Sequence, residues 1–259
     1  MAEVRPRPYG EGLCEGADSV LGKARLILES FRVEDVELSL SELARRTGIS
    51  KASVHRLAQE LLAWGMLERS GQSYRLGMRA FELGSRVPRF RVLRDTVRPL
   101  MEGVHFATKE TVHLAVLDGL DVLYLEKVAS TPQATRPSRI AGRMPLHSTA
   151  TGKVLLAHAP ASVFDDVVAR GLTRETPATI VMPGMLAEQL RAVRERGYAV
   201  EQEETTAGYV SVAVPLTGSS GLVLAAVSIT APAFRADVPR YVKALSTVSD
   251  RVATLDHIN

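Results

Sequence analysis

One stretch in the N-terminal part of the chain decides its fold. It reads Ser39-Leu40-Ser41-Glu42-Leu43-Ala44-Arg45-Arg46-Thr47-Gly48-Ile49-Ser50-Lys51-Ala52-Ser53-Val54-His55-Arg56-Leu57. Ser41 suits a helix N-cap and Gly48 a helix stop, so a short helix is expected between them. A second helix is expected to open at Ser50 and to run to Trp64. Two helices joined by so tight a turn predict a helix-turn-helix.

The second of these helices carries one apolar stripe, formed by Val54, Leu57, Ala58 and Leu61. When that stripe is buried, polar residues fall on or beside the opposite face. In a helix-turn-helix, residues near the start of this helix meet base edges in the major groove, where Arg and Lys pair with guanine and Gln with adenine. We therefore predict a DNA-binding set on this helix: Ser50, Lys51, Ser53, His55, Arg56 and Gln59.

A hairpin is expected next, because alternating runs at 66–69 and 73–76 flank a turn that contains Gly71. Arg69 and Arg75 would then lie on a wing that touches the DNA backbone or the minor groove. The alternative is a small helical subdomain whose basic face is merely solvated. Arg45 and Arg46 are equally open to that interpretation, since Glu42 can pair with either of them.

Charge is distributed unevenly along the 259 residues, although the net charge is only +3. Residues 41–91 hold ten Arg and Lys against four Glu, a net charge of +6, so the remainder sums to −3. Hydrophobic residues make up 46% of the chain, which allows a sizeable core and excludes a disordered or collagen-like class. No apolar run is long enough for a membrane span, no signal peptide is recognisable, and a lone cysteine fits a cytoplasmic location.

The pattern divides the chain into four parts. Residues 1–18 are expected to be a flexible tail, 19–77 a winged helix-turn-helix, 78–92 a linker helix, and 93–259 an effector-binding and oligomerisation domain. The linker helix should dimerise through Met78, Phe81 and Leu83. In the last part, an amphipathic helix with Leu93, Val97, Leu100 and Val104 on one face precedes a mixture of strands and helices. Strands are expected at 112–117, 120–128, 199–203, 209–216 and 222–230, and helices at 150–157, 162–169, 186–196 and 238–255. Antiparallel hairpins mixed with helices predict an α+β fold.

The stretch 39–57 and the wing ending at Gly77 resemble the DNA-binding domain of IclR-type transcriptional regulators. The second half agrees independently, through motifs at 110–117, 145–157, 194–198 and 225–229 in the family's order. The resemblance covers about 19–255. It implies a bacterial regulator with a winged helix-turn-helix and a GAF-like effector-binding domain with an antiparallel sheet. Such regulators form homodimers, often paired into dimers of dimers, and bind small organic or aromatic acids.

The same resemblance implies an effector-binding set: Ala150, Thr151, Glu201, Ser211, Ser228 and Thr230. The amides of Ala150 and Thr151, near a helix N-terminus, would suit a carboxylate. Three positions depart from the family. Ser211 stands where cysteine is frequent, Glu201 where aspartate is frequent, and Thr230-Ala231-Pro232 replaces the usual Ser-Gly-Pro.

Catalytic and cofactor motifs fail on their spacing. Thr151-Gly152-Lys153 lacks the preceding glycine and the following Ser or Thr of a phosphate-binding loop, so Lys153 is interpreted as a structural or rim residue. His147-Ser148 has no nucleophile elbow around it, so His147 is expected to order a turn. No histidine pair has the spacing of zinc ligands. We expect no catalytic residue, no metal and no cofactor.

An acidic run follows the strand expected at 199–203. Glu203 and Glu204 are interpreted as a solvated edge, and Glu201 alone as part of the effector cavity. The resulting hypothesis is a regulator that binds double-stranded operator DNA and controls catabolic or metabolic genes in response to a small acid. Two alternatives stay open: a metabolite-processing enzyme with a docking domain, and a constitutive DNA-binding protein whose second domain only oligomerises.

Overall fold

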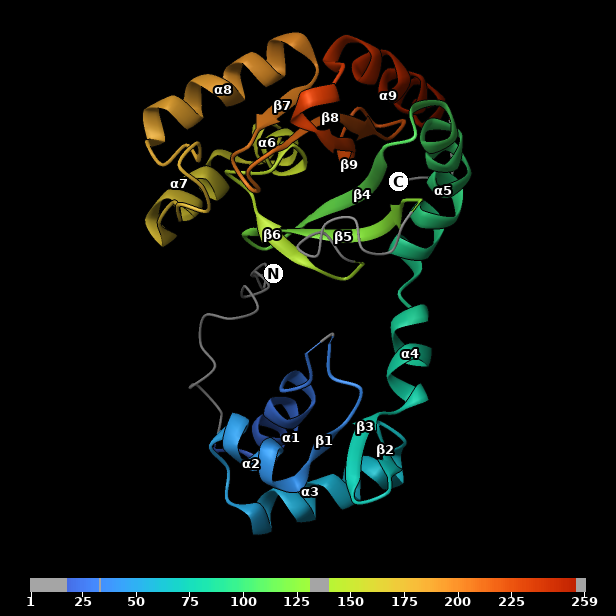
Figure 1. Cartoon of the computed structure of the whole chain (residues 1–259), viewed down its shortest axis with the longest axis vertical. Helices are drawn as coiled ribbons and strands as arrows, with labels where there is room; N and C mark the ends of the chain where they lie inside the picture. The colour runs from blue at the N-terminus through green and yellow to red at the C-terminus, as the bar shows by residue number, and fades with distance from the viewer. Residues whose placement is uncertain (1–17, 33, 131–139, 255–259) are drawn as a thin grey trace. The chain divides into compact units, whose positions relative to one another are not determined.

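The structure is a computed structural model that describes residues 18–32, 34–130 and 140–254. These residues belong to two compact units, one ending at Arg91 and the other beginning at Val92 (Figure 1). The tail predicted at 1–18 lies, apart from Asp18, outside the described residues. Within the described ranges, no helix has the length and apolar character needed to cross a membrane.

The N-terminal unit is a helix-turn-helix followed by a hairpin, as predicted. Its elements are α1 (Val20–Glu29), β1 (Leu38–Ser39), α2 (Leu40–Thr47), α3 (Lys51–Trp64), β2 (Leu67–Ser70), β3 (Ser73–Leu76) and α4 (Met78–Ser85). The three strands form one antiparallel sheet in the order β1-β3-β2. The stripe of Val54, Leu57, Ala58 and Leu61 is buried against Ile27 of α1 and other apolar residues, as its spacing predicts.

The cap of α2 corrects one expectation. Ser39 is its N-cap, not Ser41, and the Ser39 hydroxyl accepts a hydrogen bond from the Glu42 N–H at 3.2 Å. Ser39 and Glu42 have the spacing of a capping box, which satisfies donors at the helix start and draws Leu40 into the helix. Ser39 also belongs to β1, a two-residue strand that the sequence pattern did not indicate.

The predicted linker, residues 78–92, is not one helix. It contains α4 and the first residues of α5 (Pro88–Thr108), with the break at 86–87. A proline disfavours helical dihedrals in the residue before it but fits the first turn of the next helix, where its missing N–H is not needed. Pro88 therefore both ends one helical stretch and starts the other.

The C-terminal unit is built on a six-stranded antiparallel sheet in the order β6-β5-β4-β9-β8-β7. The strands are β4 (Thr111–Asp118), β5 (Asp121–Val128), β6 (Arg143–Pro145), β7 (Ala199–Gln202), β8 (Tyr209–Thr217) and β9 (Val223–Pro232). The predicted α+β class is thus confirmed. The short strand β6 and a 3-10 turn at Ala233–Arg235 are additions that no periodicity indicated.

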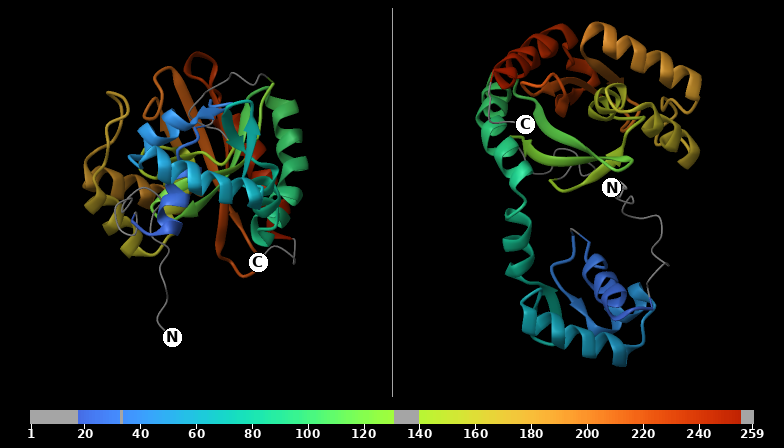
Figure 2. Two further views of the ribbon diagram at one scale, coloured as in Figure 1. Left: turned by 90° about the horizontal axis from the view of Figure 1, so that it is seen from below. Right: turned by 180° about the vertical axis from the view of Figure 1, so that it is seen from behind.

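Helices cover this sheet. They are α5, α6 (Ala150–Ala157), α7 (Ala161–Arg170), α8 (Pro183–Arg196) and α9 (Val238–Ala253). Helix α6 packs on β8, β9 and α8, and α9 packs on β8. Figures 1 and 2 show α5 and α9 together at one side of the unit and α7 and α8 at the other. The core between the sheet and α6–α8 includes Leu146, Val154, Leu186 and Val193.

Helix α6 lies unusually close to the turn that precedes it. A Cβ on Gly152 would stand 2.5 Å from Oγ1 of Thr149 and 2.6 Å from Cα of Leu146, and closer still to the Leu146 carbonyl oxygen. Real Cβ atoms essentially never approach other atoms within 3.0 Å. Only glycine therefore lets the first turn of α6 pack on this turn, and all eight residues of the helix are buried.

We predict that Gly152→Ala lowers the free energy of unfolding by about 1–3 kcal/mol, because the added methyl must displace backbone. The matched control is Gly103→Ala in α5, where an added Cβ meets nothing within 4 Å. That change should raise the stability by up to about 1 kcal/mol, the ordinary preference for Ala over Gly within a helix. Urea unfolding of both variants checks this. Equal stabilisation by the two substitutions would contradict the close approach.

Candidate functional site

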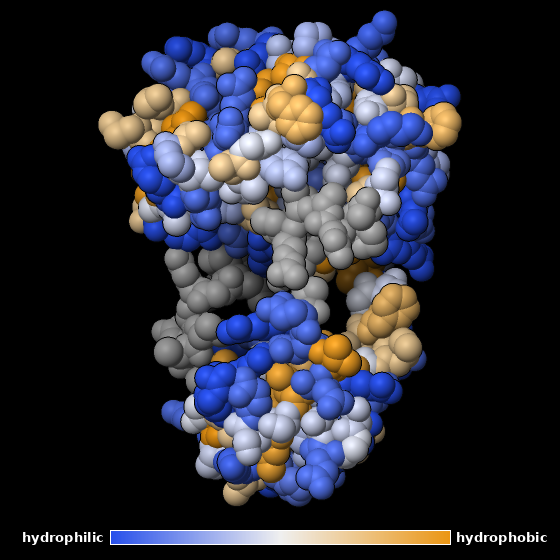
Figure 3. Space-filling view, viewed as in Figure 1, coloured by the Kyte–Doolittle hydropathy of each residue, from blue (hydrophilic) through white to orange (hydrophobic). Residues whose placement is uncertain are grey.

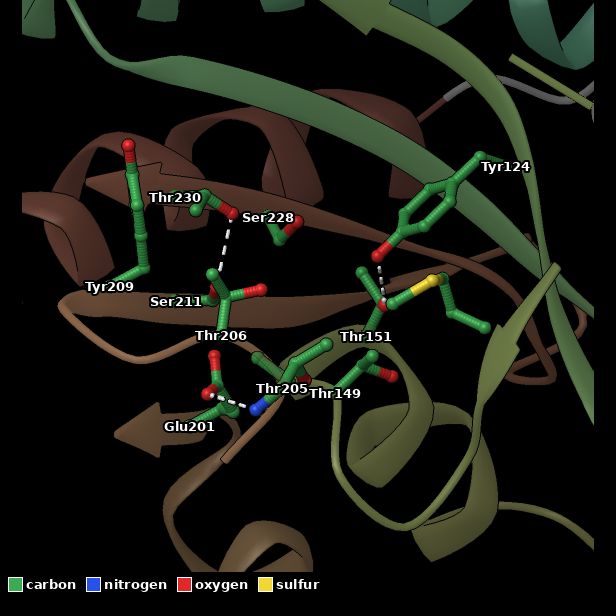
Figure 4. A pocket seen from close by; sticks show the side chains of 12 residues that line it. Tyr124, Thr149, Thr151, Glu201, Thr205, Thr206, Tyr209, Ser211, Ser228 and Thr230 are labelled. Carbon is green, nitrogen blue, oxygen red and sulfur yellow. Dashed lines mark hydrogen bonds between the residues drawn. The ribbon is translucent and has the colours of Figure 1, made fainter. Parts of the chain in front are cut away.

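The C-terminal unit contains a polar cavity between α6 and the sheet (Figure 4). The space that no atom fills is about 470 Å³, open solvent at its mouth included. Twelve residues line it: Tyr124, Met144, Thr149, Ala150, Thr151, Glu201, Thr205, Thr206, Tyr209, Ser211, Ser228 and Thr230.

One wall is a row of polar side chains across three strands. Glu201 on β7 pairs in register with Ser211 on β8, and Ser211 pairs with Thr230 on β9. Residues directly opposite one another in an antiparallel sheet project from the same face, so register alone brings these three together. Ser228, two residues before Thr230, extends the row on that face because side chains alternate along a strand. Figure 4 shows Thr230 and Ser228 next to each other, with Ser211 and then Glu201 below them.

The opposite wall is the N-terminus of α6. Thr149 is the N-cap, and its hydroxyl accepts a hydrogen bond from the Gly152 N–H at 3.0 Å and donates to the Pro145 carbonyl at 2.8 Å. Within the described residues, the N–H groups of Ala150 and Thr151 make no hydrogen bond. Free amides at a helix N-terminus attract anions, since the helix dipole and the donors act together.

Glu201 is the acidic group of the cavity, and only 3% of it is exposed. Its Oε1 accepts hydrogen bonds from the N–H groups of Glu204, at 2.5 Å, and Thr205, at 3.0 Å. Burial raises the pKa of Glu201 to about 7, against these hydrogen bonds and one from Ser211, which favour the charged form. Because Ser211 has a single hydrogen, donating it to Glu201 means that it accepts from the Thr230 hydroxyl, 3.0 Å away.

All six residues predicted for the effector site line this one cavity. That they bind an effector stays a prediction. The sequence analysis did not single out Tyr124, Met144, Thr149, Thr205, Thr206 or Tyr209. Thr149, Thr205 and Thr206 are hydroxyl residues beside two predicted positions, Ala150 and Glu201, and that proximity is the one signal that could have found them. Nothing local marks Tyr124, whose hydroxyl lies 3.4 Å from that of Thr151.

One expectation about the charged residues near the cavity needs correction, and another is decided between its two alternatives. Glu204 is not on a solvated edge, because it is 4% exposed and its Oε1 pairs with the ammonium of Lys153. Lys153 is fully buried and also donates to Oε1 of Gln189 at 2.6 Å, so it is structural rather than a rim residue. Glu203 is exposed, as predicted. His147 bonds through Nε2 to the Thr173 carbonyl at 2.9 Å, which fits the expected ordering role.

A buried histidine lies beside the cavity, on the same face of the sheet as Ser228. His113 on β4 pairs in register with Ser228, and its ring centroid lies 5.0 Å from that of Tyr124. Burial lowers the pKa of His113 to about 3, so its ring is neutral near pH 7. No group of three His, Cys, Asp or Glu side chains in the described part of the chain has the geometry of a metal site.

The predicted DNA-binding residues lie on the exposed side of α3 and on the hairpin. Ser50, Lys51, His55, Arg56 and Gln59 are exposed and Ser53 is half-buried. Lys51, Arg56 and Gln59 make no hydrogen bond or ion pair with any described residue, so their donors are available.

The two hairpin residues of that set have partners of their own. Arg69 lies 4.5 Å from the centre of the Tyr74 ring, and Arg75 pairs with Glu68 at 2.8 Å. Both residues are exposed, so each can still approach a phosphate.

The open question about Arg45 and Arg46 is settled by their contacts. Glu42 pairs with both, at 2.6 and 2.7 Å, and hydrogen bonds from Arg45 and Arg46 lower its pKa to about 2. Arg46 also binds Asp35 and the Ser30 carbonyl, and its side chain is 17% exposed. Arg46 therefore ties α2 to the segment before it, whereas Arg45 is 73% exposed.

Comparisons with known proteins agree with this architecture. Residues 20–71 match the model of the IclR helix-turn-helix domain, and residues 89–256 match that of the bacterial transcriptional regulator IclR C-terminal domain. Together these matches cover most of the chain. The predicted resemblance is therefore confirmed, and with it a regulator rather than a metabolite-processing enzyme.

Individual relatives are similar over nearly their whole length. The HTH-type transcriptional regulator XynR of Escherichia coli is 33% identical over 83% of this chain and 86% of its own. BhcR of Paracoccus denitrificans is 34% identical over 96% and 89%. A crystal structure of an IclR homolog from Microbacterium hydrocarbonoxydans, complexed with 4-hydroxybenzoate, superposes with a TM-score of 0.85 at 33% identity, over 91% of this chain and 98% of that one. This chain belongs to the IclR family of ligand-responsive, DNA-binding bacterial transcriptional regulators.

Proposed function

We propose that the effector of this regulator is a hydroxylated aromatic carboxylic acid, with 4-hydroxybenzoate as the first candidate. The observation that carries the proposal is that the cavity has hydrogen-bond donors at one wall and an acidic acceptor at the facing wall. Two unbonded N–H groups lie at the start of α6, and the Glu201 carboxyl lies in the facing wall. A similar structure holds 4-hydroxybenzoate, which has an acid at one end of a ring and a hydroxyl at the other.

The carboxylate of the effector would bind at the N-terminus of α6. The N–H groups of Ala150 and Thr151 would donate to it, and the hydroxyl of Thr151 or Thr149 can add a further contact. No described lysine or arginine lines the cavity, so the helix dipole and neutral donors are what would balance the ligand charge. Such a site favours a monoanion over a dianion.

The other end of the effector would face the row on β7–β9. Glu201, with a pKa of about 7, accepts a hydrogen bond from a ligand hydroxyl most strongly when it is ionised. Ser211, Ser228 and Thr230 offer hydroxyls that can donate or accept as the ligand requires. Tyr124, Tyr209 and Met144 supply the apolar and aromatic surface that a ring needs.

Operator recognition would fall to α3 and the β2–β3 wing. Lys51, Arg56 and Gln59 support this assignment, because their side chains are exposed and unpaired within the described residues. Lys51 and Arg56 also lie in the first half of the helix. Ser50, Ser53 and His55 accompany them, and Arg69 and Arg75 would contact the DNA backbone. Residues 19–77 would then be the DNA-binding domain, with 78–92 as the linker and 93–259 as the effector domain.

The chain would act as a homodimer, or a dimer of dimers, through the apolar face of α4. Met78 is 63% exposed and Phe81 72% exposed, and Leu83 is half-buried. Figure 3 shows apolar surface over α4 on the side that it draws. Large exposed apolar residues on one short helix are typical of an association surface. Two copies of α3 would also match the two half-sites of a palindromic operator.

The recognition assignment predicts that Arg56→Ala or Lys51→Ala weakens binding to an operator, selected in vitro from random duplexes, by roughly 1–3 kcal/mol. Arg79→Ala is the matched control, because it removes the same charge from α4, where Arg79 pairs with Glu82. Fluorescence anisotropy at fixed salt measures the affinities. Unchanged binding by both α3 variants, or an equal loss in the control, would contradict the assignment.

The effector assignment predicts that Ser228→Leu abolishes the thermal shift produced by 4-hydroxybenzoate while operator binding persists, because the larger side chain fills the cavity. Ser162→Leu, at an exposed position on α7, is the control and should respond as the unmodified protein does. A screen of aromatic and aliphatic acids by thermal shift tests the ligand class. A Ser228→Leu variant with undiminished ligand affinity would show that the effector binds elsewhere.

A further inference from the structure

The segment Glu203–Gly208, between β7 and β8, forms one edge of the cavity through Thr205 and Thr206. Its backbone is strained where it leaves the strand. Glu203 has φ = 58°, a left-handed conformation that costs a residue with a Cβ on the order of 1 kcal/mol or more. Such a conformation persists only where surrounding contacts impose it. The N–H of Glu203 donates to the Tyr209 carbonyl at 2.8 Å, its carboxylate accepts from the Gly208 N–H at 2.7 Å, and the next residue, Glu204, supplies further contacts.

Glu204 is held through all three of its polar groups. Its N–H donates to Oε1 of Glu201 at 2.5 Å, and its carbonyl accepts from the Thr179 hydroxyl at 2.6 Å. Its carboxylate pairs with Lys153. The Thr176 hydroxyl adds a hydrogen bond to the Glu203 carbonyl at 2.6 Å. The position of this segment therefore depends on contacts with β7 and β8, with the loop after α7 and with α6.

Lys153 is the contact from α6. It follows Ala150 by about one helical turn, and Ala150 and Thr151 both line the cavity. Its side chain is fully buried between α8 and the segment Glu203–Gly208. Burial lowers the pKa of Lys153, and the Glu204 carboxylate counteracts that shift. A buried ion pair is seldom more stabilising than two packed apolar side chains, because both charges lose their hydration. A gain in stability is thus a poor reason for this chain to bury the pair. A charged hydrogen bond fixes the positions of both partners, and that is a better reason.

These contacts affect the cavity because they determine the orientation of the Glu201 carboxylate. Its Oε1 is occupied by the N–H groups of Glu204 and Thr205, so the orientation of its carboxylate follows the position of these two residues. Ser211 also donates to this carboxylate, and a ligand hydroxyl would meet it in the orientation that these donors set. If Glu204 moves, Glu201 loses the two donors that orient it and that partly offset the effect of burial on its charge.

We propose that Lys153 is a positioning residue of the effector site. Through its ion pair with Glu204 it holds the segment 203–205, so that the Glu201 carboxylate is presented to the ligand hydroxyl. The proposal rests on the proposed function for the identity of the ligand. It makes Lys153 a determinant of specificity for hydroxylated over unsubstituted aromatic acids, without contact between Lys153 and the ligand.

The first test needs no ligand. In Lys153→Met, the amides of the peptide that contains Glu204 and Thr205 should exchange with deuterium at least about tenfold faster, as expected for loss of a charged hydrogen bond. Hydrogen exchange followed by mass spectrometry on the full chain measures this. The matched control is Val167→Ala, which removes buried apolar volume from α7 and leaves the Lys153–Glu204 pair intact. Its exchange at 203–205 should be unchanged.

The second test compares 4-hydroxybenzoate with benzoate by calorimetric titration. In the unmodified protein we expect 4-hydroxybenzoate to bind about tenfold more tightly, the value of one hydrogen bond to a charged group. In Lys153→Met this preference should fall to about twofold or less, with benzoate affinity little changed. In Val167→Ala the preference should survive. A general structural role for Lys153 would weaken both ligands equally and leave their ratio intact.

Lys153→Met leaves Glu204 buried without a partner, so the double variant Lys153→Met/Glu204→Leu provides a folded apolar replacement of the pair. It should show the same faster exchange and the same loss of preference. Unchanged exchange and an unchanged ratio in either folded variant would overturn the proposal. Absence of aromatic acid binding to the unmodified protein would instead contradict the proposed function, and the exchange measurement would still decide the role of Lys153.

Discussion

The effector domain depends on how closely the first turn of α6 approaches the turn before it. Gly152 leaves no side chain in that contact, and the Thr149 hydroxyl caps the helix through the Gly152 N–H. This packing places Ala150 and Thr151 at the wall of the cavity and buries Lys153 in the same helix. One short helix thereby supplies one wall of the cavity and, through the pair of Lys153 with Glu204, a contact to the segment at its edge.

The sheet contributes the second half of the site by register alone. Glu201, Ser211 and Thr230 meet because β7, β8 and β9 are neighbours in antiparallel pairing. Such a row needs no special backbone geometry, and a change of side chain on it alters the polarity of the cavity without altering the pairing of the strands. The glutamate at position 201 and the serine at position 211 are therefore natural places for members of one family to differ in the acid that they recognise.

The parts of this structure that the sequence predicts are those governed by local rules. The apolar stripe of α3 follows from helical spacing, and six of the residues that line the cavity follow from motifs of the family. The prediction was wrong where a remote partner or a competing cap decides the outcome. Lys153 and Glu204 are 51 positions apart, so no local pattern shows that each neutralises the other in the core. Ser39 and Ser41 both suit a cap, and the contact with Glu42 selects Ser39.

The central claim is that ligand in this cavity and DNA on α3 are coupled in one regulator. The most direct measurement is a reciprocal titration: the affinity for 4-hydroxybenzoate with and without saturating operator, and the affinity for operator with and without saturating 4-hydroxybenzoate. Thermodynamic linkage requires that operator change the affinity for 4-hydroxybenzoate by the same factor as 4-hydroxybenzoate changes the affinity for operator. We predict that this factor lies between about 5 and 150. If both partners bind tightly and neither changes the affinity for the other, the cavity and α3 are not coupled.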